Sequence, residues 1–580
     1  MTNNWDIVLD QAFAAYNTGD FPHAEGLCRE VLSAEPNHGD ALFLMGLIAY
    51  RSGALEPAID LMFRAVQSYP DIDNYRLTLA SFLQKQGRLD EALTQYQKCP
   101  NHPMGLAQQG FIYLQKNQND LGVKAFHRAS ELSPKLPEAR LGLAITDQDL
   151  PTLKQVAEET NLPDAWYYLA RLYQQKEEWN LALKAIEKTG LEQASYCLNQ
   201  GIIYEHLEQW DEALKAYKKA SELEPYTPEP WANQANIFRR QGDWAAAEHY
   251  YKRALAQDKD YIPARHNLAD LMTRGDRVAE ALEQYRTILS QNPNYEPALY
   301  NLAVILERVG EYAEAAGLYI KILLSDNPPG DIRWRLANTL ALLAESNQKL
   351  AADFAKGWIQ NFPKDPVAAH IDAAFRKQKE TDITDYVRTL YDDFAATYDL
   401  TMLRLNAKAV EETLALIPSG SYAKALDLGC GTGAVGSALR GRVQNLTGVD
   451  LSEPMLAKAK ANDAYRHLYL SDIQSFLASH KSKYDLITLV EVLEYLPDIR
   501  PIFQEIVTHL KKKGLFAFSI ETTSKSEPFL SPNGRYLYPE SYIKQIIEDI
   551  GITILKQKKI NIRNDGISFA EGYAFLTQKS

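Results

Sequence analysis

The segment Ala425-Leu-Asp-Leu-Gly-Cys-Gly-Thr-Gly-Ala434 joins a short apolar run to a turn with three glycines. The apolar run predicts a buried strand, and the residues from about Val435 onward predict a helix. Glycine lets a backbone turn sharply and approach a ligand with no side chain in between. The free N–H groups at the start of the helix point toward that turn. The segment therefore predicts a strand–turn–helix unit that holds a ligand in its turn.

Two classes of cofactor fit this glycine pattern. Gly431, Gly433 and Gly436 satisfy the G-x-G-x-x-G fingerprint of dinucleotide-binding domains. Asp450 closes a second apolar run, where a carboxylate accepts hydrogen bonds from ribose hydroxyls in either cofactor class. Asp472 follows a third apolar run, in a place where it can read an adenine amino group. The glycines alone do not choose between the two classes.

Together with Asp427, these residues resemble the class I S-adenosylmethionine-dependent methyltransferases. The family's D-x-G-x-G-x-G segment, its acid after the second strand and its Asp–apolar pair after the third occur here in order, within residues 385–580. The resemblance implies S-adenosyl-L-methionine as cofactor and a Rossmann-like α/β fold, with a seven-stranded, mostly parallel sheet that closes with an antiparallel hairpin. The cofactor-binding residues that it implies are Tyr398, Asp427, Gly429, Gly431, Gly433, Asp450, Leu451, Met455, Asp472, Ile473 and Val490.

Apolar runs that end near residues 428, 449 and 470, and further runs at 484–490 and 514–520, alternate with helical segments. This alternation predicts a parallel sheet with helices on both faces and ligands beyond the carboxyl ends of its strands. Two late runs, 552–555 and 573–576, are joined by a polar stretch around 564–566 and favour an antiparallel hairpin. A dehydrogenase would more often continue with parallel units, so the hairpin argues against a nicotinamide cofactor.

Residues 5–363 repeat with a period of 34. Alanine recurs at positions 24, 58 and 92 and again at 213, 247, 281 and 315, and prolines end several units. The period and the residue types resemble the tetratricopeptide repeat, a helix–turn–helix unit. Such units bury their faces only by stacking, so the resemblance implies an all-α superhelix with a concave groove. The middle, about 100–165, departs from the period, which predicts an irregular pair there.

The predicted domains are a repeat array at 1–366, a junction with a linker helix at 367–384 and a methyltransferase domain at 385–580. Asparagine also recurs every 34 residues, on the first helix of four consecutive repeats. These asparagines are Asn199, Asn233, Asn267 and Asn301. In peptide-binding arrays of this family, such a row resembles clamps on an extended backbone, and a carboxamide can both donate and accept. The hypothesis gives the groove a protein or peptide partner; the alternative is that asparagine is merely common at this position.

Several side chains near the strand ends are candidates for chemistry on the methyl acceptor. Methyl transfer needs alignment and exclusion of water, and it needs a base only if the acceptor arrives protonated. Glu491, Tyr495 and Glu521 are the candidates for catalysis. Related enzymes often carry histidine at the position of Tyr495, which argues against a histidine base here. The helix predicted over 386–401 carries Tyr391 and Tyr398, which by the same resemblance close the site; packing on the sheet is the alternative.

The segment Asn533-Gly-Arg-Tyr536 is similar to the GRY segment of bacterial methyltransferases that carry tetratricopeptide repeats. By that resemblance Arg535 binds an acidic acceptor and Tyr536 walls it. The alternative is a plain turn before a helix that starts at Pro539.

Charge and cysteine spacing exclude several classes of function. Residues 381–580 carry 23 basic and 24 acidic side chains and the rest carries 39 and 51, so there is no basic stripe for nucleic acid. Four scattered cysteines form neither a disulfide framework nor a zinc spacing, so we expect no metal. The first residues lack the features of a signal peptide and no apolar run could span a bilayer, so we expect a cytoplasmic protein that does not enter a membrane.

The sequence thus predicts a methyltransferase whose repeats recruit a protein partner or substrate. The acceptor is either a small metabolite, which the tyrosine-bearing helix favours, or a protein segment, which the asparagines favour. A non-catalytic repeat scaffold with a domain that senses S-adenosylmethionine is the alternative, and an oxidoreductase is a further one.

Overall fold

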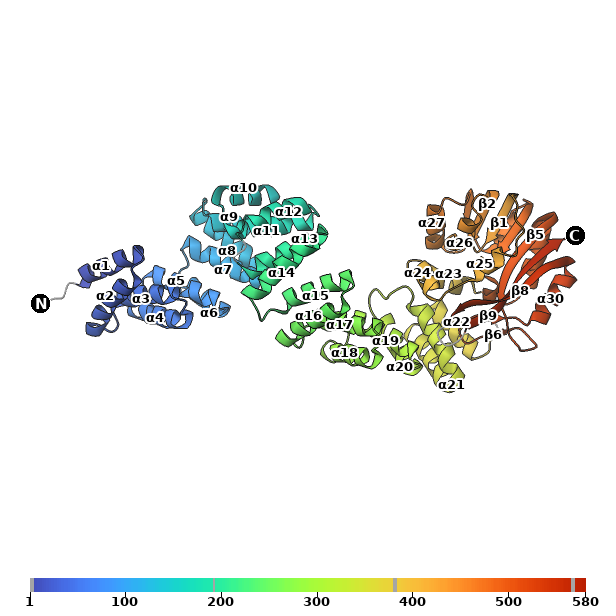
Figure 1. Cartoon of the computed structure of the whole chain (residues 1–580), viewed down its shortest axis with the longest axis horizontal. Helices are drawn as coiled ribbons and strands as arrows, with labels where there is room; N and C mark the ends of the chain where they lie inside the picture. The colour runs from blue at the N-terminus through green and yellow to red at the C-terminus, as the bar shows by residue number, and fades with distance from the viewer. Residues whose placement is uncertain (1–4, 191–192, 379–382, 565–568) are drawn as a thin grey trace. The chain divides into compact units, whose positions relative to one another are not determined.

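The computed structural model describes residues 5–190, 193–378, 383–564 and 569–580. The chain forms two compact units, Met1–Tyr261 and Ile262–Ser580. The division falls inside the repeats, so the last repeat helices belong to the same unit as the β-sheet (Figure 1). The three domain boundaries stay a prediction. Residues 379–382 of the expected junction and 565–566 of the expected hairpin loop lie outside the described residues.

The first unit is built of helices that pack in consecutive pairs. Its helices are α1 (Trp5–Asn17), α2 (Phe21–Ala34), α3 (Gly39–Arg51), α4 (Leu55–Ser68), α5 (Asp73–Lys85), α6 (Leu89–Gln97), α7 (Pro103–Gln115), α8 (Asn119–Leu132), α9 (Pro137–Thr146), α10 (Leu150–Thr160), α11 (Pro163–Gln175), α12 (Trp179–Glu187), α13 (Ala194–His206), α14 (Trp210–Leu223), α15 (Pro228–Gln241) and α16 (Trp244–Gln257). The irregular pair expected near 100–165 corresponds to the short helices α9 and α10.

Small residues let the paired helices approach closely. Gly201 of α13 faces the ring of Tyr217 of α14, and a Cβ at this glycine would lie 2.3 Å from the ring. Tyr217 is fully buried, and its hydroxyl donates to Glu205 at 2.6 Å. The ring therefore fills the space that glycine leaves, while its polar end keeps a hydrogen-bond partner.

The second unit begins with further helices, the last of which lies in the predicted junction. They are α17 (Ile262–Arg274), α18 (Val278–Gln291), α19 (Glu296–Arg308), α20 (Tyr312–Leu323), α21 (Ile332–Asn361) and α22 (Pro366–Phe375). The long α21 contains a kink at Asn347, whose φ of −148° and ψ of 78° are not helical. Asp365 begins α22 by accepting hydrogen bonds from two backbone N–H groups, those of Val367 and Ala368.

The rest of the second unit is an α/β domain. Its helices are α23 (Thr384–Phe394), α24 (Tyr398–Arg404), α25 (Ala409–Leu414), α26 (Ala434–Ala438), α27 (Glu453–Ala461), α28 (Ile473–Ser479), α29 (Arg500–His509) and α30 (Glu540–Asp549), with a 3₁₀ turn at Leu493–Tyr495. Its strands are β1 (Tyr422–Leu428), β2 (Val443–Asp450), β3 (His467–Leu470), β4 (Tyr484–Leu489), β5 (Leu510–Glu521), β6 (Phe529–Leu530), β7 (Tyr536–Leu537), β8 (Ile552–Asn564) and β9 (Phe569–Lys579).

Seven of these strands form one sheet in the order β3-β2-β1-β4-β5-β9-β8. The first five are parallel, β9 runs antiparallel to β5, and β8 runs antiparallel to β9. The predicted fold class is therefore confirmed, including the antiparallel close. A small antiparallel pair, β6 and β7, was not predicted, because two-residue strands leave no periodic pattern in a sequence.

The sheet core consists of apolar side chains on the central strands. Leu426, Leu428, Ile487 and Leu489 are fully buried on the adjacent strands β1 and β4. Burying each such side chain stabilises the fold by about 1.5–3 kcal/mol, which keeps the carboxyl ends of these strands in fixed positions. Among the described residues, no helix combines the length and apolar character needed to cross a bilayer.

Candidate active site

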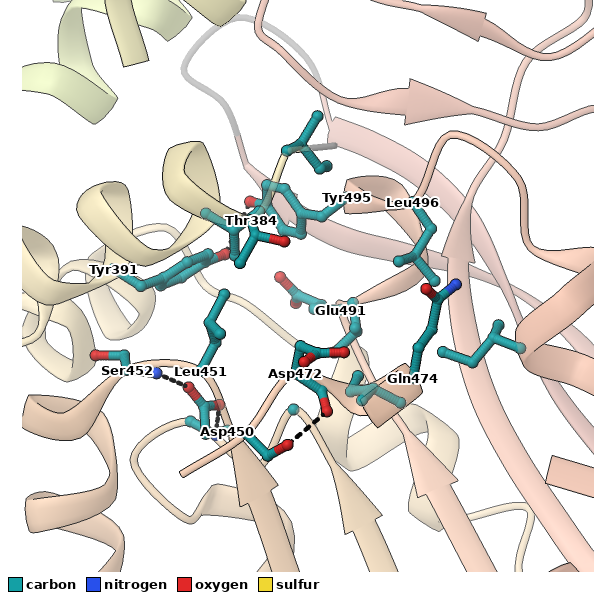
Figure 2. A pocket seen from close by; sticks show the side chains of 18 of the residues that line it. Thr384, Tyr391, Asp450, Leu451, Ser452, Asp472, Gln474, Glu491, Tyr495 and Leu496 are labelled. Carbon is teal, nitrogen blue, oxygen red and sulfur yellow. Dashed lines mark hydrogen bonds between the residues drawn. The ribbon is translucent and has the colours of Figure 1, made fainter. Parts of the chain in front are cut away.

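A cavity of about 830 Å³ lies beyond the carboxyl ends of β1, β2, β3 and β4. The strand order reverses between β1 and β4, which is where open α/β sheets bind their ligands. The walls of the cavity come from the segments after these four strands, from α23 and from the start of α24 (Figure 2). The sheet topology thus gathers side chains from distant parts of the sequence around one space.

The glycine turn after β1 forms one wall of the cavity. Gly429, Gly431 and Gly433 have φ angles of +70°, +52° and +92°, in the left-handed region that glycine adopts at little cost. A Cβ at Gly429 would lie 2.3 Å from the side chain of Val492, whereas a Cβ at Gly431 would meet no protein atom within 4 Å. Gly431 lines the cavity, so the absent side chain leaves its space to a ligand.

Asp450, the last residue of β2, also lines the cavity. Its Oδ2 accepts a hydrogen bond from the N–H of Gly431 at 2.8 Å, and its Oδ1 accepts one from the N–H of Ser452 at 2.9 Å. Burial raises the pKa of this carboxyl group, and the backbone donors oppose that shift. Each oxygen has a second lone pair, so the carboxylate can still accept from two ligand hydroxyls.

Asp472 follows β3 and begins α28. Its carboxylate accepts a hydrogen bond from the N–H of Ser475 at 2.8 Å, which fixes the side chain as the helix cap. Ile473 lies beside it, and the apolar side chains of Leu451 and Met455 line the cavity as well. This part of the wall offers one carboxylate beside apolar surface, an arrangement that suits an aromatic base with a polar edge.

The other end of the cavity holds phenolic side chains and one carboxylate. The hydroxyl of Tyr391 donates to that of Tyr495 at 2.8 Å, and the ring of Tyr398 meets the ring of Tyr391 edge-on, with centroids 6.0 Å apart. Figure 2 shows Tyr391, Tyr495 and Glu491 around the same space. Glu491 follows β4 with a φ of +55°, an uncommon conformation for a residue with a side chain. Such backbone strain is characteristic of functional sites. The backbone N–H of Glu491 donates to Ser519 Oγ at 2.9 Å.

A buried ionic cluster supports this end from behind. Arg535 and Arg563 contact the same oxygen of Glu521, at 3.0 and 2.7 Å, and Arg535 Nε also donates to the hydroxyl of Tyr495 at 3.2 Å. Glu494 is 1% exposed. Desolvation and the neighbouring carboxylates Glu521 and Glu491 hold the pKa of Glu494 well above its usual range. The hydrogen bond from Arg535 therefore holds the Tyr495 side chain in place, and the paired charges of the cluster lie behind it.

Asp427 lies beneath the glycine turn, outside the cavity wall. It is 1% exposed, and its carboxylate accepts hydrogen bonds from the hydroxyls of Tyr465, at 2.7 Å, and Thr488, at 2.8 Å. Burial raises the pKa of Asp427 to about 7. The Tyr465 hydroxyl also accepts from the N–H of Gly436 at 3.1 Å. Asp427 thus ties the end of β1 to the helix that follows the turn.

Most residues proposed for the cofactor gather in the cavity wall. Nine of the eleven line it, and the exceptions are Asp427 and Gly433. A Cβ at Gly433 would lie 3.2 Å from the Cα of Ala459, so this glycine allows the turn to pack on α27. Of the catalytic candidates, Glu491 and Tyr495 line the cavity, whereas Glu521 lies in the cluster behind it.

The two acceptor candidates in the GRY segment are buried. Arg535 is 5% exposed and paired with Glu521, and Tyr536 is 4% exposed within β7. Neither is among the residues that line the cavity.

Two residues that support the site, Tyr465 and Arg563, were not predicted from the sequence. Both are far in sequence from the groups that they contact, so no local pattern marks them.

The repeat asparagines lie beside the packing tyrosines. Asn301 donates to the hydroxyl of Tyr285 at 3.2 Å, and Asn233 hydrogen-bonds to Tyr217, 16 residues earlier in both cases. Asn199 is 8% exposed, and Asn267 and Asn301 are partly buried. In the part of the chain that the structure describes, at least two of these amides therefore hold tyrosine hydroxyls; their contact with a peptide stays a proposal.

Segments in both parts of the chain match known families. Residues 426–518 match the family described as "Methyltransferase domain". Residues 191–260, 238–291 and 267–332 match families described as "Tetratricopeptide repeat", and residues 17–99 match "Anaphase-promoting complex, cyclosome, subunit 3". The chain joins tetratricopeptide repeats to a class I S-adenosylmethionine-dependent methyltransferase domain. The matched part of the methyltransferase domain runs from β1 into β5 and includes the glycine turn and Asp450.

Individual relatives resemble one part of the chain or the other. The methyltransferase domain is 36% identical over 104 residues to a ubiquinone biosynthesis O-methyltransferase of Actinobacillus pleuropneumoniae. The matched segment covers 17% of this chain and 44% of the relative. The chain spans about half the length of the curated relatives that it matches. A tetratricopeptide repeat protein of Parabacteroides merdae is 21% identical over 38% of this chain and 93% of that structure, with a TM-score of 0.33. The N-methyltransferase NodS of Bradyrhizobium japonicum, in complex with S-adenosyl-L-homocysteine, is 20% identical over 29% and 85%, with a TM-score of 0.25.

Proposed function

We propose that this protein transfers a methyl group from S-adenosyl-L-methionine to an acceptor bound in the cavity of its methyltransferase domain. One observation carries the proposal: Gly431, Asp450, Asp472 and Glu491 lie at or just beyond the carboxyl ends of four different strands and line one cavity. The matched relative is named as an O-methyltransferase, which supports an oxygen atom in the acceptor.

The residues present fit this cofactor. The two oxygens of Asp450 would accept hydrogen bonds from the ribose hydroxyls, and Asp472 with Ile473 would hold the adenine. The open space beside Gly431, where a side chain would otherwise project, lets the backbone approach the ligand closely. The cavity volume of about 830 Å³ lies within the range typical of small-molecule sites, so there is room for an acceptor beside the cofactor.

When bound, S-adenosylmethionine supplies a methyl group that its positively charged sulfur makes electrophilic. The protein's own contribution is to align the acceptor and to exclude water. Tyr391 and Tyr495 wall the acceptor end of the cavity, and their mutual hydrogen bond holds both rings in place. Glu491 takes the proton of an acceptor hydroxyl, because its carboxylate lies in the same cavity and is attached to a fixed, strained backbone position.

The tetratricopeptide repeats recruit a protein partner. The first unit contains a hollow of about 1190 Å³ that aromatic and polar side chains line, among them Tyr96, Phe111, Tyr167 and Tyr196. Aromatic side chains beside polar groups suit the recognition of an extended peptide, since they offer large contact area at a low cost in conformational entropy. Asn199 and Asn233 follow the hollow in the same unit, and we expect the partner to contact these two residues as well.

Titration calorimetry of the full chain with S-adenosylhomocysteine, with NAD as the control ligand, tests the cofactor. We expect micromolar binding of the first ligand alone. The acceptor is then sought by incubating the protein with labelled S-adenosylmethionine and a cell lysate. Glu491→Gln should retain the affinity for S-adenosylhomocysteine and lower the transfer rate by about 10²–10⁴-fold, as expected for a lost general base. Binding without any transfer would instead support the scaffold that senses the cofactor, and binding of neither ligand would refute the proposal.

A further inference from the structure

Helix α23, which forms one wall of the cavity, rests on α21 and α22, and all three belong to the same compact unit. Arg333 of α21 makes the main polar contact. Its Nε donates to Asp365, the cap of α22, at 2.9 Å, and another nitrogen donates to Asp393 of α23 at 2.5 Å. The desolvated guanidinium keeps a raised pKa because of its two carboxylate partners. One side chain thus joins α21, α22 and α23.

A first row of rings leads from the repeat helices to the cavity. Trp334 of α21 stacks on Phe394 of α23, with centroids 5.2 Å apart and an interplanar angle of 22°. Phe394 in turn meets the ring of Tyr398 edge-on, at 5.4 Å and 77°. Trp334 and Phe394 are 7% and 1% exposed, and Tyr398 lines the cavity. A shift of Trp334 would therefore pass through Phe394 to a side chain of the cavity wall.

A second row starts on α22. The imidazole of His370 stacks on the ring of Tyr386 of α23, with centroids 3.9 Å apart, and its Nε2 lies 3.0 Å from the carbonyl oxygen of Gly534. The ring of Tyr386 lies 6.3 Å from that of Tyr495, which lines the cavity. His370 is 1% exposed, so this residue of α22 is part of the core beside the acceptor end.

Two glycines show how closely the backbones approach at these contacts. A Cβ at Gly330, just before α21, would lie 1.9 Å from the carbonyl oxygen of Asp393. A Cβ at Gly534 would lie 2.8 Å from the hydroxyl of Tyr386 and 3.1 Å from the ring of His370. The contact surfaces therefore fit only without a side chain at either position.

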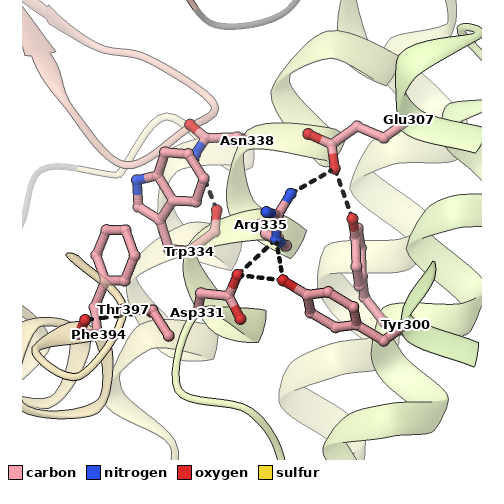
Figure 3. Close-up of polar contacts among 9 residues, drawn as sticks. Tyr300, Glu307, Asp331, Trp334, Arg335, Asn338, Phe394 and Thr397 are labelled. Atoms are coloured by element: carbon pink, nitrogen blue, oxygen red, sulfur yellow. Dashed lines mark hydrogen bonds and ion pairs between the residues drawn. The ribbon is translucent and has the colours of Figure 1, made fainter. Parts of the chain in front are cut away.

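The opposite side of α21 is fixed to the preceding repeat. Arg335 contacts Asp331 at 2.7 Å, the hydroxyl of Tyr300 at 3.2 Å and Glu307 at 3.4 Å, and Tyr300 also donates to Asp331 at 2.8 Å (Figure 3). Asp331 is 2% exposed and Arg335 is largely buried. Figure 3 shows this network beside the contact between Trp334 and Phe394. A buried network of this kind leaves α21 little freedom to move relative to α19.

From these contacts we infer that Arg333, Trp334 and His370 are positioning residues for the methyl-transfer site, and that α21 and α22 hold its wall helix α23 in place. The role of the site in methyl transfer rests on the proposed function. The support of α23 by α21 and α22 rests on the contacts alone. It follows that residues 385–580 by themselves lack the support of this cavity wall, and that whatever moves α21 or α22 also moves the wall.

The test uses full-length variants. Trp334→Leu removes the ring stacked on Phe394, whereas Trp334→Phe keeps a ring there. Gly330→Ala adds the Cβ that meets Asp393, and Gly357→Ala, within α21, is its control, because a Cβ there meets no atom within 4 Å. A displacement of about 1 Å in a positioning element costs up to about 10²-fold in rate. We therefore expect Trp334→Leu and Gly330→Ala to weaken S-adenosylhomocysteine binding and slow methyl transfer by at least about ten-fold, and both controls to stay near wild type.

Hydrogen exchange of the amides in 384–404 is the second measurement, and it needs no cofactor. We expect faster exchange in this segment for Trp334→Leu than for Trp334→Phe, below the melting temperature of both. Equal exchange in the two variants would overturn the inference, whether or not the wild-type protein binds S-adenosylhomocysteine. Failure of the wild type to bind that ligand would refute the proposed function and leave the exchange result to decide on the support of α23. If Gly330→Ala does not fold, the Trp334 pair alone decides.

Discussion

Replacing Asp450 tests the assignment of the cofactor site most directly. Asp450→Ala removes the two carboxylate oxygens that would accept hydrogen bonds from the ribose, while the cavity keeps its glycine turn and its apolar wall. A hydrogen bond to a charged group contributes about 1.5–3 kcal/mol, and water replaces part of what is lost. We therefore expect binding of S-adenosylhomocysteine to weaken by about 1–3 kcal/mol in total, which corresponds to about 5- to 150-fold in Kd.

The same substitution also affects stability, and the structure shows why. The N–H groups of Gly431 and Ser452 lose the carboxylate that accepts from them at 2.8 and 2.9 Å. Asp450→Asn separates the two effects, because an amide keeps one oxygen acceptor and nearly the same shape. We expect its affinity to fall between those of the wild type and Asp450→Ala.

Asp485, near the amino end of β4 and so away from the cavity, offers a matched control. Its carboxylate also accepts from a backbone N–H, that of Lys424 at 2.9 Å, and it pairs with Lys511 at 2.8 Å. Asp485→Ala should lower the melting temperature but leave the affinity for S-adenosylhomocysteine unchanged. Calorimetric titration of all four full-length proteins gives the comparison. An affinity of Asp450→Ala within about two-fold of wild type, less than 0.5 kcal/mol, would refute the ribose assignment.

Two further predictions concern the glycine turn and the acid beneath it. Gly431→Ala should weaken binding of S-adenosylhomocysteine at least about ten-fold, since a positive φ disfavours alanine and the added Cβ enters the cavity. Gly551→Ala is the control: its φ is +75° and an added Cβ also meets no atom within 4 Å, so it should lower stability without changing the affinity. Burial raises the pKa of Asp427 to about 7, so the folded state holds a proton that the unfolded state releases near pH 4, and stability is lost as the pH rises from about 4 through 7. Asp427→Asn removes this loss, so its melting temperature should rise relative to wild type between pH 5 and pH 8, and a constant difference would contradict the raised pKa.

Local sequence patterns predicted the fold because each depends on neighbouring residues. The 34-residue period specifies paired helices, since each unit repeats the same small and aromatic positions, and Tyr217 does fill the space that Gly201 leaves. The alternation of strands and helices predicted the parallel sheet, and the late pair of strands predicted the antiparallel close. The residues that end the strands could likewise be placed near the ligand, because the carboxyl ends of parallel strands lie at one edge.

The supporting residues of the site could not be found in this way. Asp427 belongs to the glycine motif in the sequence, yet in the structure it holds Tyr465 and Thr488 beneath the turn instead of lining the cavity. Arg535 pairs with Glu521 and supports Tyr495 from behind. Whether a side chain near a strand end faces the ligand or the core depends on the packing of segments distant in sequence, which periodicity and spacing do not report.

The sequence by itself determined the two kinds of architecture, the cofactor class that the glycine turn resembles and the residues at the ends of β1, β2 and β4. These features follow from local propensity, periodicity and short motifs, all of which act between residues close in the chain. Only the tertiary structure decided that the last repeat helices belong to the unit that contains the sheet and that Trp334 and His370 pack behind the tyrosines of the cavity. The reason is that the hydrogen bonds from Arg333 to Asp393 and from His370 to Gly534 join residues about 60 and 160 positions apart, and such pairs form only when the apolar faces of separate elements pack together.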